Sequence, residues 1–388
     1  MSTPKPAIEV ADIFRNFDHL LGKLPKDQYK VIRAIKNCRT KVLGGHSLKC
    51  GSCGFKKNFY NSCRSRFCPK CQYLKQVKWV GRRCEELLPC EYFHVVFTLP
   101  TELRALILRN KKVAYNILFK SSSDALKEVT KMQSGSDADS GHIGVLHTWS
   151  QNLLDHPHIH YIVPGGTLNK KRTKWVASNE NFLVPVKVLS KVFMGMFLKQ
   201  LEVAFDNGDF NFMGDIDYLS HPGNFQELLT SCSQKKWIVY CKKPFLGPKQ
   251  VLSYLGKYTH RIAISNYRIV KLENERVFFK VRDNKSPEKQ KIMSLHVTEF
   301  MRRFLLHVLP KGFVRMRHFG LLGNRYKKEK IAIIRKLNGV LEKLISKVEE
   351  DWKGMLRRLT EINPDLCPKC RDGFLENIEA FPLMLNSG

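Results

Sequence analysis

Two histidines in the segment 156–161, which reads His-Pro-His-Ile-His-Tyr, could bind a metal ion. In a β-strand, residues two apart point to the same face, so His158 and His160 would present their imidazoles together. Imidazoles bind magnesium or manganese only in combination with oxygen ligands, and the open coordination positions could hold phosphate oxygens. Taken alone, such a pair is equally compatible with packed or surface histidines.

A third protein ligand would complete this site. We favour His147, on the strand that precedes the histidine segment, over Gln151, which lies in the intervening turn. His156 precedes a proline and is expected at the entrance of the strand, where it could orient the site. The expected site is open and depends on substrate oxygens to fill its coordination sphere.

A tyrosine pair farther along the chain could supply a nucleophile. Tyr254 and Tyr258 are four residues apart, which places both side chains on one face of a helix. A phenol has a pKa of about 10, so it attacks a phosphodiester only if positive charge stabilises the developing phenolate. Convergence with the metal site would allow DNA cleavage through a 5′-phosphotyrosine, with a free 3′-OH. The alternative is that both rings are core aromatics beside Leu252 and Leu255.

Four cysteines form two pairs with the spacing of zinc knuckles. Cys50 with Cys53 and Cys68 with Cys71 are separated by fourteen residues, close to the spacing of a four-cysteine zinc ribbon. Each pair can span one edge of a coordination tetrahedron. The spacing therefore predicts one structural zinc site, against the alternative of buried free thiols.

Other cysteine and histidine residues are further candidates for zinc ligation. Cys63 and His46 lie within the same module and could replace a ligand or bind a second ion. Cys367 and Cys370 repeat half of the knuckle pattern near the C-terminus, in a Cys-Pro-Lys-Cys segment. This half pattern is either part of a zinc site or a reactive or incidental pair of thiols, and the sequence leaves the choice open.

The composition limits the class of protein. Lysine and arginine number 66 against 35 acidic residues, and the formal net charge of +31 favours nucleic acid as the partner. The candidate contacts to DNA are Arg64, Arg66, Lys257, Arg261, Arg315 and Arg317. The hydrophobic content of 43% allows a sizeable core, and no apolar tract has the length of a membrane span. We expect a cytoplasmic protein, in which the twelve cysteines serve metal ligation before disulfides.

The elements that would position these residues indicate an α+β fold with a central antiparallel sheet flanked by helices. Runs of β-branched and aromatic residues predict strands at 92–99, 143–149, 158–163, 237–241, 266–270 and 276–281. Apolar periodicity predicts helices at 8–38 with a break near Pro25, at 72–88, at 102–132 and at 186–205, followed by the tyrosine helix.

The order of these elements suggests three domains. Residues 1–90 would form a helical N-terminus with a zinc-binding ribbon at about 46–71, and residues 91–295 a nuclease domain with the histidines and the tyrosine helix. Residues 296–388 are densely basic and are predicted to be mainly helical, as expected for a DNA-binding region.

Six collinear motifs between residues 40 and 325 resemble the transposases of the insertion sequence 91 family. They lie at 43–46, 62–71, 147–149, 156–166, 254–266 and 304–320. This family belongs to the His-hydrophobic-His endonucleases, together with rolling-circle replication initiators, relaxases and Helitrons.

The resemblance implies a bacterial, nucleoid-associated two-tyrosine transposase that nicks single-stranded DNA at element ends and moves one strand by a rolling-circle-like route. It implies metal ligation by His158 and His160, nucleophilic attack by Tyr254 and Tyr258, and zinc ligation by the four knuckle cysteines. Tyr254 is expected to be the essential tyrosine, because some relatives keep only the first of the pair. The implied partners are single-stranded transposon ends and target DNA, without a membrane, and a homo-oligomer is allowed.

Two other functions fit parts of the sequence. A rolling-circle replication initiator or a relaxase would use the same chemistry, but the cysteine module and the basic C-terminal motif fit a transposase better, and no helicase phosphate loop is present. A non-catalytic zinc-ribbon protein would bind DNA without cleaving it.

Overall fold

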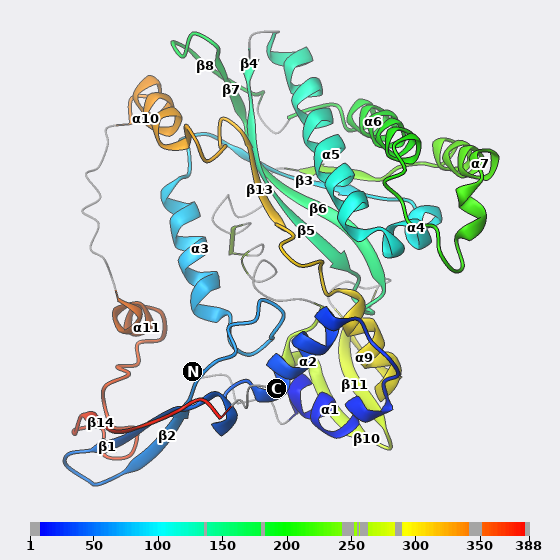
Figure 1. Ribbon diagram of the computed structural model, residues 1–388. Coiled ribbons are helices and arrows are strands. Elements are labelled where there is room, and N and C mark those ends of the chain that lie inside the picture. Colours follow the sequence, from blue (N-terminus) through cyan, green and yellow to red (C-terminus); the bar gives the residue numbers. More distant parts are fainter. Residues whose placement is uncertain are drawn as a thin grey trace. The chain divides into compact units, whose positions relative to one another are not determined.

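The computed structural model describes most of the chain, in two compact units (Figure 1). The described ranges are 8–135, 138–179, 183–242, 252–253, 256, 263–283, 289–340 and 351–384. The first unit draws on residues 1–75, 260–302 and 344–388, and the second on residues 76–259 and 303–343. None of the helices in the described ranges combines the length and the apolar character that crossing a bilayer requires.

A five-stranded antiparallel sheet forms the centre of the second unit. Its order is β13 (Met316–Gly320), β5 (Gly141–Trp149), β6 (Asp155–Pro164), β3 (Tyr92–Thr98) and β9 (Val239–Lys242). Strand β6 lies in the middle, and most of its residues and all residues of β5 are buried. The antiparallel α+β architecture predicted from the sequence is confirmed.

The register of this sheet sorts side chains onto two faces. His147 of β5 is the cross-strand partner of His158 on β6, and Val145 is the partner of His160. On the other side of β6, Val96 of β3 also pairs with His160. Because alternate residues share a face, His147, His158 and His160 lie on one face of the sheet, which we call the histidine face. Phe97 and Tyr161 lie on the other face.

Helices cover the face that carries Phe97 and Tyr161 (Figure 1). These helices are α4 (Arg104–Arg109), α5 (Lys111–Ser134) and α6 (Val186–Asp206), and α7 (Pro222–Ser233) packs against α6. The ring of Phe97 meets those of Phe193 at 4.8 Å and Tyr161 at 5.7 Å, and Tyr161 Oη is 2.8 Å from Ser122 Oγ. Gly144 allows Tyr161 to lie flat against the sheet, because an added Cβ would come within 2.5 Å of its ring.

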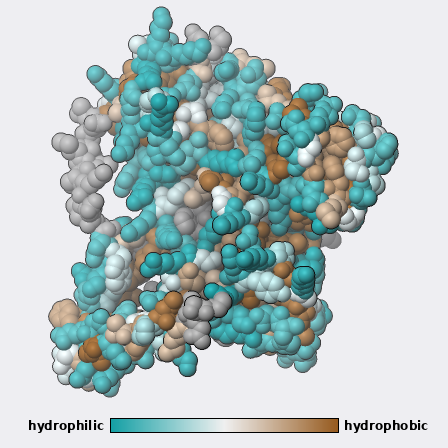
Figure 2. Space-filling view, viewed as in Figure 1, coloured by the Kyte–Doolittle hydropathy of each residue, from teal (hydrophilic) through white to brown (hydrophobic). Residues whose placement is uncertain are grey.

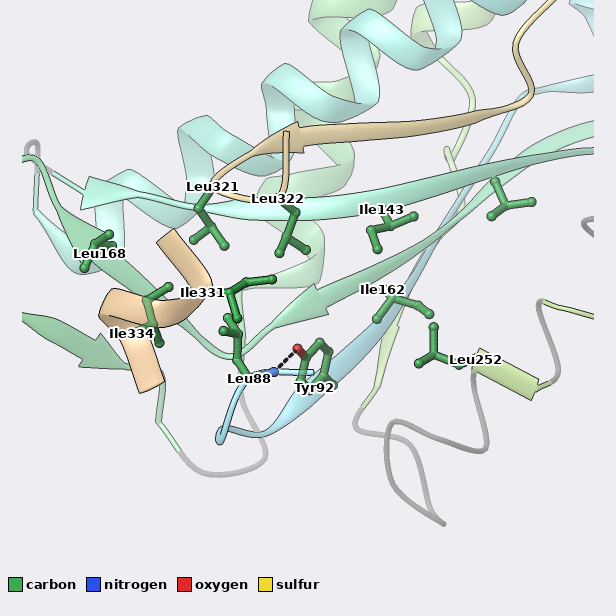
Figure 3. Close-up of a cluster of buried hydrophobic side chains, with 11 residues drawn as sticks. Leu88, Tyr92, Ile143, Ile162, Leu168, Leu252, Leu321, Leu322, Ile331 and Ile334 are labelled. Carbon is green, nitrogen blue, oxygen red and sulfur yellow. Dashed lines mark hydrogen bonds between the residues drawn. The ribbon is translucent and has the colours of Figure 1, made fainter. Parts of the chain in front are cut away.

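The face that carries the histidines is covered by a hydrophobic cluster drawn in Figure 3. Ile143, Val145 and Ile162 of the sheet contribute to it. Helix α3 (Tyr73–Glu85) packs against it through Trp79 and Val80, and helix α10 (Lys327–Leu337) contributes Ile331 and Ile334. The other residues of the cluster are Leu88, Tyr92, Leu168, Leu252, Leu321 and Leu322. A small sheet of β4 (Ala138–Asp139), β7 (Gly166–Asn169) and β8 (Trp175–Ala177) lies in the same unit.

The first unit contains two three-stranded antiparallel sheets. One has the order β14 (Leu375–Phe381), β1 (Gly45–Cys50) and β2 (Lys56–Tyr60), and the other has the order β10 (Ile269–Glu273), β11 (Arg276–Arg282) and β12 (Gln290–His296). Its helices include α1 (Val10–Phe17), α2 (Lys26–Asn37) and α11 (Trp352–Thr360), and α9 (Val297–Leu306) begins in it. The N–H of Val10 donates to Asn266 Oδ1 at 3.1 Å, which ties α1 to the segment before β10.

Several predicted elements differ from those observed. The helix expected at 102–132 is divided at Asn110, whose side chain bonds the carbonyls of Leu106 and Asn211. Strands β13 and β14 lie in the C-terminal third, which was predicted to be mainly helical. Both are edge strands without a buried residue, so they lack the apolar alternation by which a strand is recognised. The predicted tyrosine helix lies largely outside the described residues.

Buried histidines make the stability of the protein sensitive to acid. Burial lowers the pKa of His142 and of His307 to about 3, and each ring is hydrogen bonded, His142 to Ser123 and His307 to Thr148. Between a pH of about 6.5 and about 3 the unfolded chain binds protons that the folded chain does not. The free energy of unfolding therefore falls as the pH falls below about 6.5.

We predict that His142→Gln reduces this dependence by up to about 1.4 kcal/mol per pH unit between pH 6 and 4.5. Urea unfolding at several pH values measures the slope. His19→Gln, which removes an exposed histidine, provides the control for the loss of one imidazole. Equal slopes for the wild-type protein and His142→Gln would contradict the assignment.

Candidate active site and metal centres

Three imidazoles converge on the histidine face of the central sheet. One ring nitrogen from each of His147, His158 and His160 lies within 4.8 Å of those from the other two. His147 and His160 are buried, with ring centroids 4.2 Å apart, and His158 is half-buried. Strands β5 and β6 fix all three Cα positions, so a cation at this point would meet a rigid set of ligands.

The environment keeps these imidazoles neutral. Burial lowers the pKa of His158 to about 4 and the pKa of His147 and of His160 well below the usual value. Mutual repulsion between the rings adds to this effect, because a second imidazolium nearby would be unfavourable. A neutral imidazole offers a lone pair, so the cluster is suited to a metal ion at neutral pH.

Hydrogen bonds orient two of the three rings. His158 Nδ1 donates to the carbonyl oxygen of His156 at 2.6 Å, so a metal would be bound through Nε2. His160 Nδ1 is 2.8 Å from Nε2 of His94 on β3, and the two rings stack at 5.0 Å. His156 is the second residue of β6, as expected for a residue at the strand entrance.

His94 is a site residue that the sequence does not reveal. It lies within a predicted strand, but its nearness to His160 depends on the pairing of β3 with β6 in one particular register. The same pairing information separates the two candidates for a third ligand. His147 lies directly opposite His158, whereas Gln151 is exposed in the turn between β5 and β6.

The tyrosine pair lies outside the described residues, as do Lys257 and Arg261. Two neighbours of the tyrosines are described. Leu252 is buried in the hydrophobic cluster with Ile162 and Val145, on the histidine face of the sheet (Figure 3). Gly256 approaches α3 so closely that an added Cβ would lie 2.3 Å from Cγ2 of Val80.

The other candidate contacts to DNA differ in exposure. Arg64 is exposed, and Arg66 is half-buried with its guanidinium 4.9 Å from the ring of Phe67. Arg317 lies 4.2 Å from the ring of Phe119 and bonds a side chain of α5, so part of its role is packing. Arg315 is buried, which does not favour a contact to DNA at the surface.

Four cysteines of the first unit form a cluster that would suit zinc. The sulfurs of Cys38, Cys63, Cys68 and Cys71 lie within 4.8 Å of one another, and those of Cys63 and Cys71 are 3.6 Å apart. Tetrahedral zinc with Zn–S bonds of about 2.3 Å separates its sulfurs by about 3.8 Å. The N–H of Lys70 donates to Cys68 Sγ at 3.4 Å, which helps to stabilise a thiolate.

A second cluster contains the other predicted knuckle. Cys50 and Cys53 lie with Cys367 and Cys370, and all four sulfurs are again within 4.8 Å. The predicted single site of Cys50, Cys53, Cys68 and Cys71 is therefore replaced by two clusters, each of which contains one of the predicted pairs.

The reason for the different grouping is the β1–β2 hairpin. The turn of this hairpin carries the first knuckle, Cys50 and Cys53. Strand β14 pairs with β1 and thereby brings the C-terminal knuckle, Cys367 and Cys370, beside the first. Cys63 joins the cluster of Cys38, whereas His46 lies on β1 and stacks on Phe59 at 5.8 Å, in neither cluster. Cys38 has no partner at knuckle spacing in the sequence, so spacing alone did not identify it.

Comparison with known proteins identifies two family models that match parts of the chain. Residues 10–99 match a family model described as "Transposase zinc-binding domain", and residues 141–330 match one described as "Putative transposase". No solved structure matches the chain significantly.

Two curated proteins are similar over most of the chain. "Putative transposase y4qJ" of Sinorhizobium fredii (strain NBRC 101917 / NGR234) is 42% identical over 379 residues, which are 96% of this chain and 95% of that protein. "Transposase for insertion sequence element IS801" of Pseudomonas savastanoi pv. phaseolicola is 25% identical over 341 residues, which are 83% of this chain and 77% of that protein.

An antiparallel α+β unit with a three-histidine cluster, joined to a cysteine-rich zinc-binding domain, defines a DNA transposase. The chain belongs to the insertion sequence 91 family of transposases. The resemblance seen in the sequence motifs is thereby confirmed.

We predict that His94→Ala weakens the affinity for Mn²⁺ by about 10- to 100-fold, because ligand orientation by a hydrogen-bonded neighbour typically contributes this much. His94→Gln, which keeps a polar group near His160 Nδ1, should lose less. Titration of the protein with Mn²⁺, followed by electron paramagnetic resonance, measures the affinity without DNA. His19→Ala is the control, and an unchanged affinity in His94→Ala would exclude a role for His94 in positioning.

Proposed function

We propose that this transposase nicks single-stranded DNA at the ends of its element through a 5′-phosphotyrosine and transfers the strand by a rolling-circle-like route. The observation that carries the proposal is the cluster of three neutral imidazoles, two of them buried and one half-buried, on one face of the central sheet. Such a set leaves coordination positions for phosphate oxygens and water, which magnesium and manganese require.

The histidines would hold the cation against the scissile phosphate. Magnesium or manganese bound to His147, His158 and His160 would supply positive charge to the phosphate and to a nearby phenolate. His94 and the carbonyl of His156 would keep two of the rings oriented. Arg315 contributes to lowering the pKa of His147, after burial and the neighbouring histidines, and thus helps to keep that ligand neutral.

The nucleophile would be Tyr254 or Tyr258. In the proposed step the phenolic oxygen forms a bond to phosphorus and the bond from phosphorus to the 3′ oxygen breaks. The phenol loses its proton, and the departing 3′ oxygen gains one, which leaves a 3′-OH and a 5′-phosphotyrosine. Attack by the 3′-OH of a DNA strand would reverse the step and join the ends.

Two described neighbours support a place for the tyrosines near the histidines. Leu252, two residues before Tyr254, packs on the same face of the sheet as the histidine cluster. Gly256, between the two tyrosines in the sequence, approaches Val80 of α3, whose side chain packs against the same hydrophobic cluster.

The remaining parts of the chain would bind the DNA and position it. The net charge of +31 supports binding to the phosphate backbone, and hydrophilic side chains cover most of the surface seen in Figure 2. We propose that the zinc-binding region within residues 1–90 and the basic region 296–388 serve this role, and that residues 91–295 form the nuclease region. In the zinc-binding region, Arg64 is the more exposed of the two candidate contacts, Arg64 and Arg66.

We predict that Tyr254→Phe reduces the nicking rate by at least about 1,000-fold, because phenylalanine lacks the attacking oxygen. Tyr258→Phe should retain more activity, and the double variant should retain none above background. Nicking of end-labelled single-stranded oligonucleotides from both element ends, with Mg²⁺ or Mn²⁺, measures these rates. Binding of the same oligonucleotides should be preserved in all three variants.

The exposed Tyr267 is outside the proposed pair and offers a matched control, since Tyr267→Phe removes the same atom and should nick normally. Nicking at the wild-type rate by the double variant would exclude a tyrosine nucleophile from this pair. Tight binding without nicking by the wild-type protein would instead favour a non-catalytic DNA-binding protein.

A further inference from the structure

We propose that the chain binds a second zinc ion in a site shared by an N-terminal and a C-terminal segment. The ligands would be Cys50, Cys53, Cys367 and Cys370. The C-terminal pair lies outside residues 10–99, which match the zinc-binding domain. The site would make the C-terminal segment part of the zinc-binding module. It is independent of the nicking chemistry proposed above.

The positions of the sulfurs carry the proposal. Cys50 Sγ is 3.7 Å from Cys370 Sγ, and Cys53 Sγ is 3.6 Å from Cys367 Sγ. Tetrahedral zinc needs sulfurs about 3.8 Å apart, whereas a disulfide needs about 2.05 Å. Each close pair joins one residue of the first knuckle to one of the second, as expected when two knuckles share a single ion.

The two knuckles have the same backbone conformation although they are distant in the sequence. The N–H of Gly54 donates to the carbonyl of Cys50 at 3.1 Å, and the N–H of Arg371 donates to the carbonyl of Cys367 at 3.0 Å. Gly54 and Arg371, which each follow the second cysteine of a knuckle, both have positive φ, +69° and +62°. For an arginine this conformation is unfavourable, so it indicates a turn that the surroundings impose.

Backbone donors point at the sulfurs of both knuckles. The N–H of Cys53 lies 3.4 Å from Cys50 Sγ, and the N–H of Lys369 lies 3.4 Å from Cys367 Sγ. A third donor, the N–H of Gly373, lies 3.4 Å from Cys370 Sγ. Such donors stabilise thiolates, which are the form of cysteine that binds zinc.

The sheet of the first unit brings the knuckles together. Strand β14 pairs with β1 so that Leu375 lies opposite Cys50, and the N–H of Gly51 donates to the carbonyl of Phe374 at 3.2 Å. At Gly373 an added Cβ would lie 2.4 Å from Cys50 Sγ, so only glycine allows this approach. The ion would thus fasten together segments that are more than 300 residues apart.

The two clusters make distinct predictions for metal content. With both sites filled, the wild-type protein should contain two zinc ions per chain, and the double variant Cys367→Ser/Cys370→Ser should contain one. Cys232→Ser, at a buried cysteine outside both clusters, should retain two. Cys63→Ser should lose the other ion and keep the shared one. Metal analysis of the purified proteins measures the content.

Alkylation of the cysteines identifies which residues share an ion. In the wild-type protein the exposed Cys53 should resist alkylation, together with its three proposed partners. In the double variant Cys50 and Cys53 should react, whereas Cys63 should stay protected. If Cys50 and Cys53 stay protected in that variant, they have other partners, such as Cys68 and Cys71, and the proposal is wrong.

A chelator experiment on the wild-type protein avoids any dependence on how the variants fold. Pulses of alkylating reagent during zinc removal should label Cys50, Cys53, Cys367 and Cys370 at one common rate, with one equivalent of zinc released. Immediate labelling of Cys367 and Cys370 before any zinc leaves, with Cys50 and Cys53 still protected, would overturn the shared site.

Discussion

The register between β5, β6 and β3 is the constraint on which the candidate active site depends. With His147 opposite His158 and Val96 opposite His160, four histidines from three strands gather at one place. Because side chains alternate along a strand, a slip of one residue would send the two histidines of β6 to the opposite face. The buried packing on both faces of the sheet specifies the register, since such a slip would also move Tyr161 out of its contact with Phe97.

Burial then determines the chemistry of the cluster. An imidazole that is removed from water holds its proton weakly, so the fold itself prepares neutral ligands. The same burial lowers the free energy of unfolding when the pH falls. The aliphatic packing of Ile143, Val145 and Ile162 with α3 and α10 stabilises this face of the sheet. The site that we propose for a cation and a polyanion is thus supported on a rigid, mostly apolar sheet.

The sequence predicted the features that are local. The alternation around His158 and His160, the helices interrupted near Pro25 and the knuckle spacing of the cysteines all depend on residues close in the chain. The features that it did not predict depend on pairing between distant segments. His94 joins the site through β3, Cys38 joins a cluster through the end of α2, and the partner of the first knuckle arrives on β14. In each case the sequence shows a residue that can bind a metal or a neighbouring ring, but it does not show which distant residue lies beside it in the fold.

We propose above all that a tyrosine of this chain becomes covalently attached to DNA in a step that needs the histidine cluster. The most direct test is to incubate the purified protein with single-stranded oligonucleotides from the element ends and Mn²⁺ or Mg²⁺, and to map the modified peptide by mass spectrometry. We expect a 5′-phosphate linked to Tyr254 or Tyr258, and no adduct in His158→Ala. Saturable binding without an adduct for both metals and both ends, or an adduct that persists in His158→Ala, would contradict it.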